Sequence, residues 1–170
     1  TLEELVQVGT AEDAISPAID QNEVSRIETI YRPYYDAHCL DQTAPYPGIP
    51  EAIRALRGQG ILTAVVSNKP DKAVQALVEE QFEGLFDFSI GEQPGIARKP
   101  APDMIEQCLK ALGVSAEETV YIGDSEIDLE TAANAGLDAI AVSWGFRSRA
   151  FLEKLGADPI VDSAAELLEL

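Results

Sequence analysis

Residues 119–128 read Thr-Val-Tyr-Ile-Gly-Asp-Ser-Glu-Ile-Asp. A short apolar run ends at Ile122, a glycine follows, and polar residues that favour a helix start lead to Asp128. A short buried strand followed by an amphipathic helix is the unit from which parallel α/β sheets are built. The sequence therefore predicts a strand over 119–122 and a helix that begins just after it.

The same unit recurs on both sides of this stretch. Helical patterns over 50–57, 71–82, 104–112 and 129–133 alternate with apolar runs over 61–66, 86–90 and 139–142. We expect a weaker helix near 148–155, a short strand at 160–161 and a final acidic helix from Ser163. The alternation predicts an α/β core over 44–170, with a parallel sheet and helices on both faces.

Residues 1–43 have a different pattern. Val24, Ile27, Ile30 and Tyr34 recur at helical spacing with no strand between them, which predicts a helical subdomain. Pro33 is expected to kink or split this helix, because proline removes a backbone donor and crowds the preceding turn. Residues 42–48 include two prolines and a glycine, and they are predicted to form a hinge into the core.

The composition narrows the classes of partner. Thirty acidic residues against twelve basic ones give a net charge of −18, which opposes binding to nucleic acid or to an anionic membrane. No apolar run approaches the length of a membrane span, so we expect a cytoplasmic protein. Cys39 and Cys108 lack metal or redox spacing and are expected to be unbridged core thiols. A site for a small anion must gather its own local donors.

Three polar segments follow successive predicted strands: Ser67-Asn68-Lys69-Pro70, then Arg98-Lys99-Pro100, then Gly123-Asp124-Ser125 and onward to Asp128. Each has an ordinary explanation. Asn68 could cap the helix that follows, Lys99 could be a solvated lysine, and the acids could favour a helix N-terminus. Two carboxylates one turn apart could equally hold a hard cation.

The three segments are more informative together than singly. Ligands of a parallel sheet bind at the carboxyl ends of its strands, and these segments place a hydroxyl, a cation and a carboxylate pair there. Phosphoryl transfer requires such groups: donors for the phosphoryl oxygens, a lysine against crowded negative charge, and carboxylates for Mg²⁺. The expected ligand is a small anionic phosphate ester.

At this point the chain resembles the haloacid dehalogenase superfamily, on Ser67, Lys99, Asp124 and Asp128. More narrowly, it resembles bacterial phosphoglycolate phosphatases over roughly residues 24–170. The segments that carry this narrower likeness are Pro45-Tyr46-Pro47-Gly48, Val65-Val66-Ser67-Asn68-Lys69-Pro70, Arg98-Lys99-Pro100-Ala101-Pro102, Gly123-Asp124-Ser125 and Trp144-Gly145-Phe146-Arg147-Ser148.

The resemblance implies hydrolysis of a phosphate monoester, above all 2-phosphoglycolate, through a phospho-aspartyl intermediate. It implies that Ser67 and Asn68 hold the phosphoryl group and that Lys99 neutralises charge. Asp124 would bind Mg²⁺, and Asp128 would orient Lys99 or contribute to the metal site through a bound water.

Two arginines are further candidates. Arg32 and Arg147 could bind a substrate carboxylate, since a guanidinium forks onto that group, although surface arginines with no such role are the alternative. Residues 1–43 would form the C-terminal part of a helical cap over the core at 44–170.

The chain departs from the family in one respect. The family's nucleophile lies in an Asp-x-Asp motif, and this motif occurs nowhere in the 170 residues. Its strand would be the central one, between the strands that end at Ser67 and Ile122, and its absence would expose two apolar strand edges. We expect an N-terminal portion of roughly 60 to 80 residues to be missing. A second copy or a separate segment could supply it, and the chain alone is expected to be inactive.

Other functions remain open. On the same scaffold, a pyrophosphatase or a phosphohexose mutase would carry much the same core groups, because cap residues select the substrate. A non-catalytic fragment that binds phosphate and metal without turnover is the alternative from another class.

Overall fold

A computed structural model describes residues 21–170. Its contacts divide the chain into two compact units, Thr1–Thr43 and Ala44–Leu170. Residues 1–20 of the expected cap lie outside the described residues, and the interpretation of the first unit as a cap stays a prediction.

The described part of the first unit is mainly one helix, α2 (Gln21–His38), which runs through Pro33 without a break. The predicted split at Pro33 therefore does not occur. Aromatic contacts span the proline: the rings of Tyr31 and Tyr35 stack at 5.6 Å, and those of Tyr34 and His38 lie 4.3 Å apart. These contacts join successive turns of the helix across and just after the proline.

The second unit is α/β, as predicted, and all of its strand pairs are parallel. Its elements in chain order are α3 (Ile49–Gly58), β1 (Ala64–Pro70), α4 (Asp71–Gln81), β2 (Phe88–Glu92), α5 (Asp103–Leu112), β3 (Val120–Gly123), α6 (Glu126–Ala135), β4 (Asp138–Val142), α7 (Arg149–Lys154) and β5 (Ile160–Val161). The expected acidic helix from Ser163 is wrong: only a single 3₁₀ turn forms there, over Glu166–Leu168.

The boundaries of the first two strands also differ from the prediction. β1 begins three residues later than expected and continues through Ser67 to Pro70. Its pairing with β2 shifts register between Val66 and Pro70, where Pro70 pairs with Glu92. Hydrophobicity alone cannot reveal this extension, because it runs through the polar residues Ser67, Asn68 and Lys69 before pairing resumes at Pro70.

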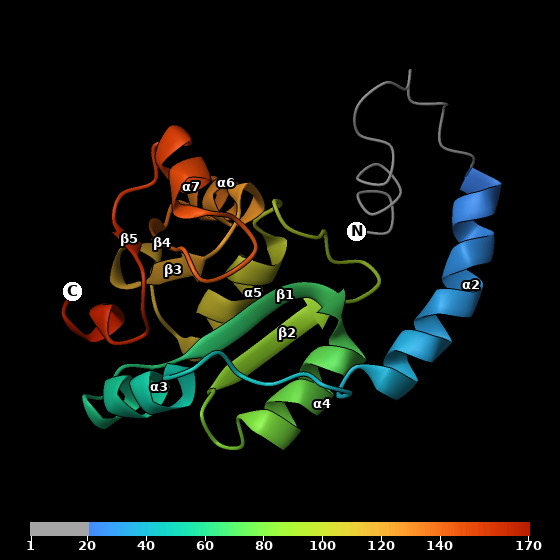
Figure 1. Ribbon diagram of the computed structural model, residues 1–170, viewed down its shortest axis with the longest axis horizontal. Helices are drawn as coiled ribbons and strands as arrows, with labels where there is room; N and C mark the ends of the chain where they lie inside the picture. The colour runs from blue at the N-terminus through green and yellow to red at the C-terminus, as the bar shows by residue number, and fades with distance from the viewer. Residues whose placement is uncertain (1–20) are drawn as a thin grey trace. The chain divides into compact units, whose positions relative to one another are not determined.

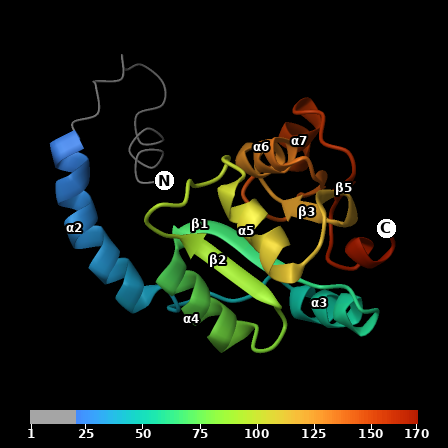
Figure 2. The ribbon, with the colours of Figure 1, turned by 180° about the vertical axis from the view of Figure 1, so that it is seen from behind.

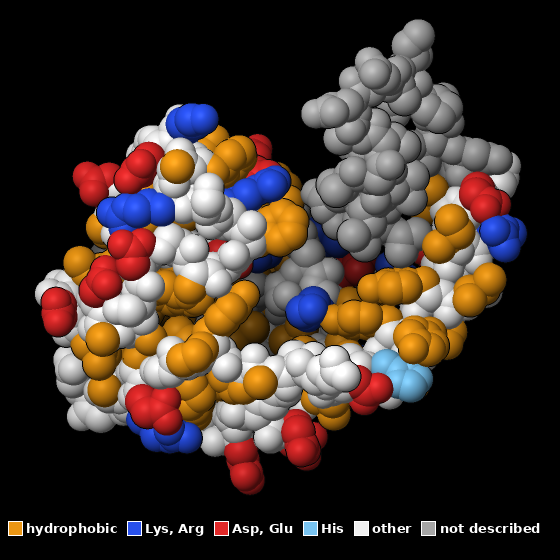
Figure 3. Space-filling view, viewed as in Figure 1, with side chains coloured by type: hydrophobic (Ala, Val, Ile, Leu, Met, Phe, Trp, Pro, Cys, Tyr) orange, Lys and Arg blue, Asp and Glu red, His pale blue; other side chains and the backbone are white. Residues whose placement is uncertain are grey.

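The strands form two separate sheets, in the orders β1–β2 and β3–β4–β5 (Figures 1 and 2). Within residues 21–170, β1 and β3 each pair on one side only. Large apolar side chains are exposed beside them, with Leu62 at 49%, Val120 at 48% and Ile122 at 42%. Figure 3 shows apolar side chains gathered on this face, in the region of α3, β1 and β3. Two strands thus have an edge without a partner among the described residues, with exposed apolar side chains nearby, and the strand expected between them stays a prediction.

The core lies between the strands and the helices that cover them. Helices α4 and α5 pack on β1 and β2, and α6 packs on β3 and β4. Ile105, Ala132 and Leu137 form the buried centre, and the ring of Tyr121 packs against them. Cys108 of α5 is a buried free thiol, as predicted, and burial raises the pKa of this thiol to about 11.

Among the residues that the structure describes, no helix is both long enough and apolar enough to cross a membrane.

Candidate functional site

The end of β1 connects directly to the lysine loop. The side-chain amide of Asn68 donates to the Lys99 carbonyl at 3.0 Å, and its oxygen accepts from the Lys99 amide at 2.9 Å. Asn68 therefore does not cap α4, whose N-cap residue is Pro70. The hydroxyl oxygen of Ser67 accepts from the Lys69 amide at 3.1 Å, and its own proton remains available for a ligand. The loop with Lys99 is thus attached to the strand that carries Ser67.

Lys99 is a buried lysine and not a solvated one, since its side chain is 13% exposed. Its ammonium donates to Oδ1 of Asp128 at 2.7 Å and to the hydroxyl of Tyr121 at 3.0 Å. Burial alone would lower the pKa of Lys99, but Tyr121 and Asp128 outweigh it, so this pKa lies above its ordinary value. Lys99 consequently carries a fixed positive charge at neutral pH.

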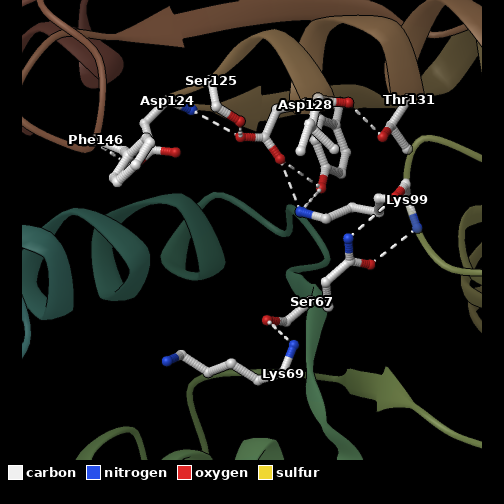
Figure 4. Close-up of polar contacts among 11 residues, drawn as sticks. Ser67, Lys69, Lys99, Asp124, Ser125, Asp128, Thr131 and Phe146 are labelled. Carbon is white, nitrogen blue, oxygen red and sulfur yellow. Dashed lines mark hydrogen bonds and ion pairs between the residues drawn. The ribbon is translucent and has the colours of Figure 1, made fainter. Parts of the chain in front are cut away.

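Asp128, at the start of α6, is engaged on both carboxylate oxygens (Figure 4). Besides Lys99, Oδ1 lies 3.4 Å from the Tyr121 hydroxyl. Oδ2 accepts from the Ser125 hydroxyl at 2.7 Å and from the Asp124 amide at 3.1 Å. Burial alone would raise the pKa of Asp128, but Lys99 and these hydrogen bonds hold it below its ordinary range. A carboxylate has about four lone-pair sites, so little capacity remains for a cation.

Asp124, four residues earlier, is only partly satisfied. Its Oδ2 accepts from the Phe146 amide at 2.9 Å, and within residues 21–170 no hydrogen bond reaches Oδ1. Burial raises the pKa of Asp124 and the neighbouring Asp128 adds to this, which outweighs the opposing effect of the Phe146 amide. A partly buried carboxylate with a raised pKa and an open oxygen fits a hard cation.

Two glycines allow the backbone to approach these carboxylates. A Cβ at Gly145 would lie 2.1 Å from Oδ2 of Asp124, and one at Gly123 would lie 2.2 Å from the Cβ of Asp128. Glycine is needed at both positions because any side chain would overlap a carboxylate-bearing residue. The loop after β4 is therefore part of the site through Gly145 and the Phe146 amide.

The side chains of the two candidate arginines each have an acidic partner. Arg147 donates to Glu126 through Nε at 2.7 Å and through a second, shorter contact, and its guanidinium lies 4.8 Å from the ring centre of Phe146. Arg32 belongs to α2, where it pairs with Glu28 at 3.2 Å. Their predicted contact with a substrate carboxylate stays a prediction.

The structure therefore joins Lys99, Asp124 and Asp128 directly and links Ser67 to them through Asn68 (Figure 4). Sequence reasoning missed Tyr121 and the function of Gly145. In the sequence, Tyr121 resembles any other strand residue, whereas Gly145 lies in segment 144–148, one of those that carry the resemblance to the family. No group of three or more histidine, cysteine or acidic residues suited to a metal occurs in 21–170.

Comparison with known proteins agrees with this geometry. Residues 3–142 match the family model for haloacid dehalogenase-like hydrolases. The chain belongs to this family. Its relatives include pyrophosphatase PpaX of Bacillus mycoides, which is 29% identical over 153 residues. The match covers 89% of this chain and 71% of PpaX.

Solved structures of the family share the fold. A crystal structure from Lactobacillus delbrueckii subsp. bulgaricus, described provisionally as a phosphoglycolate phosphatase, is 54% identical with a TM-score of 0.88. The match covers 99% of this chain and 71% of that one. CbbY from Rhodobacter sphaeroides, in complex with xylulose-(1,5)bisphosphate, is 29% identical with a TM-score of 0.72, covering 97% of this chain and 74% of its own.

Proposed function

We propose that this chain forms most of a Mg²⁺-dependent phosphatase for a small phosphate monoester, with 2-phosphoglycolate as the first substrate to test. The observation that carries the proposal is the buried Lys99–Asp128 ion pair, at 2.7 Å, beside the half-satisfied Asp124. A charged lysine is costly to bury, and its burial beside a second carboxylate is typical of functional sites. The 54% identity to the Lactobacillus structure supports this choice of substrate.

The roles follow from the contacts of each side chain. The Lys99 ammonium, oriented by Asp128, neutralises negative charge where nucleophile and phosphoryl group meet. The Ser67 hydroxyl donates to a phosphoryl oxygen. Asn68, whose amide is bonded to the Lys99 peptide, contributes by positioning that residue more than by its side chain contacting phosphate. Asp124 is the residue suited to hold Mg²⁺, which supplies charge stabilisation when bound.

We further propose that the nucleophilic carboxylate comes from a polypeptide segment that pairs as a strand between β1 and β3. These strands are each unpaired on one side within residues 21–170, and Val120 and Ile122 are exposed there. An extended apolar segment would satisfy both edges and place its carboxyl end beside Lys99. A separate N-terminal segment or a second copy of the chain could supply it.

The test is phosphate release from a panel of substrates: 2-phosphoglycolate, pyrophosphate and a hexose phosphate, each with Mg²⁺. We expect the chain alone to be inactive. Co-expression with the part of the Lactobacillus protein that this chain does not cover is expected to restore turnover, which Lys99→Met would abolish. Turnover by the chain alone, with its intact mass confirmed, would refute the proposed source of the nucleophile.

Pyrophosphate hydrolysis is the second candidate, because the curated relatives include pyrophosphatase PpaX. A higher kcat/KM for pyrophosphate than for 2-phosphoglycolate in the complemented enzyme would favour it, and a preference for the hexose phosphate would favour a sugar phosphate. Binding of Mg²⁺ and phosphate without turnover, even after complementation, would favour the non-catalytic alternative.

A further inference from the structure

Tyr121 is placed differently from the apolar residues on either side of it in β3. Val120 and Ile122 are exposed, whereas Tyr121 faces the opposite side of the strand and packs against Ile105, Ala132 and Leu137. Its ring is thus part of the core, and its hydroxyl extends beyond the core toward the candidate site. A phenylalanine would satisfy the packing requirement equally well, so the hydroxyl requires its own explanation.

The hydroxyl lies between the two charged groups of the buried pair. Its oxygen accepts from the Lys99 ammonium at 3.0 Å and lies 3.4 Å from Oδ1 of Asp128. The lysine in turn donates to Asp128 at 2.7 Å. The three polar groups therefore close a small ring in which each contacts the other two.

This ring determines the orientation of the ammonium. With Asp128 as its sole acceptor, the end of the Lys99 side chain could rotate about the Nζ···Oδ1 axis while keeping that contact, and the other two N–H bonds would change direction. Two acceptors at fixed positions remove the rotation, and tetrahedral geometry then sets the direction of the third N–H. Orientation of this kind matters most in a buried, poorly solvated site, and the Lys99 side chain is 13% exposed.

We propose that Tyr121 is a positioning residue: its hydroxyl holds the Lys99 ammonium in the orientation that presents the third N–H to a bound phosphoryl group. The proposal deepens the proposed function and rests on it for the identity of the ligand. The residue acts through Lys99, so it needs no contact with substrate.

The test uses the full 170-residue chain and the isosteric variant Tyr121→Phe, which keeps the ring in the core. Tyr46→Phe, at a residue 53% exposed, is the matched control. The first readout is the ¹⁵N signal of the Lys99 ammonium, assigned by its loss in Lys99→Met, together with its rate of hydrogen exchange. The second readout is the affinity for inorganic phosphate in the presence of magnesium chloride.

We expect Tyr121→Phe to retain the fold, to raise ammonium exchange about tenfold and to weaken phosphate binding by a similar factor, the scale of one hydrogen bond to a charged group. Tyr46→Phe should change neither. An unchanged Lys99 signal in Tyr121→Phe would overturn the proposal, as would an unchanged phosphate affinity in a wild-type chain that binds phosphate. If the wild-type chain binds no phosphate, its own residues do not form the proposed phosphate site, and the ammonium signal still decides whether Tyr121 orients Lys99.

Discussion

Asp124 and Asp128 lie four residues apart in sequence, yet the surroundings of the two carboxylates differ. The region of Asp128 supplies a lysine and three further polar groups, and the pKa of this carboxyl falls. The region of Asp124 supplies one amide to its side chain, and its pKa rises. Two identical side chains therefore have different capacities: Asp128 is committed to Lys99, and Asp124 is available for a cation.

The largest effect is expected from removing the charge that balances Asp128. Lys99→Met should lower the free energy of unfolding by about 3 kcal/mol, because it leaves a carboxylate that is 9% exposed without its counter-ion. Urea denaturation measures this. Arg54→Met is the control, since it breaks a well-exposed pair with Glu51 and should cost less than about 1 kcal/mol. Equal losses in the two variants would contradict the buried pair.

The same pair should make stability depend on pH at both ends of the range. The lowered pKa of Asp128 adds stability above its ordinary pKa, and this is lost as pH falls through the lowered value. The raised pKa of Lys99 adds stability below its ordinary pKa, and this is lost as pH rises through the raised value. The difference in unfolding free energy between the wild type and the double variant Lys99→Met, Asp128→Asn should decline at both extremes. A flat difference would mean that the pair is not formed.

Gly145→Ala tests the close approach on the Asp124 side. The added Cβ would overlap the carboxylate, so we expect a loss of about 1–3 kcal/mol in stability together with weaker Mg²⁺ binding. Gly58→Ala is the matched control, because a Cβ there meets no atom within 4 Å. Thermal unfolding and Mg²⁺ titration measure the two effects. Wild-type behaviour of Gly145→Ala would show that the loop does not abut Asp124.

The smallest effect is expected at Asp124 itself. Its raised pKa means that the folded state binds the proton more tightly than the unfolded state, so ionisation costs stability as pH rises through this titration. Asp124→Asn should therefore stabilise the metal-free chain at neutral pH. It should also abolish stabilisation by Mg²⁺. A loss of stability without metal, measured by thermal unfolding, would contradict this account.

The alternation of helices and strands predicted most of the fold. A short apolar run indicates a buried strand, and an amphipathic stripe indicates a helix with one buried face. Strand boundaries were less accurate at β1, because pairing with β2 extends it through polar residues such as Asn68. The helix continues through Pro33, where the sequence predicted a kink or a split, and aromatic rings four residues apart contact each other across and just after the proline.

The candidate site shows a similar division. The sequence pointed to Ser67, Lys99, Asp124 and Asp128 because their residue types suit the chemistry. It did not distinguish the two carboxylates, since their difference comes from partners far away in sequence, such as Phe146 for Asp124. The role of Tyr121 was hidden for the same reason: it depends on a lysine 22 residues away.

A crystal structure of this chain with Mg²⁺ and inorganic phosphate tests the central claim most directly. We predict phosphate within hydrogen-bonding distance of Ser67 Oγ and Lys99 Nζ, and Mg²⁺ on Asp124 with Asp128 still paired to Lys99. Phosphate bound elsewhere, or Mg²⁺ on Asp128 with the lysine displaced, would contradict it.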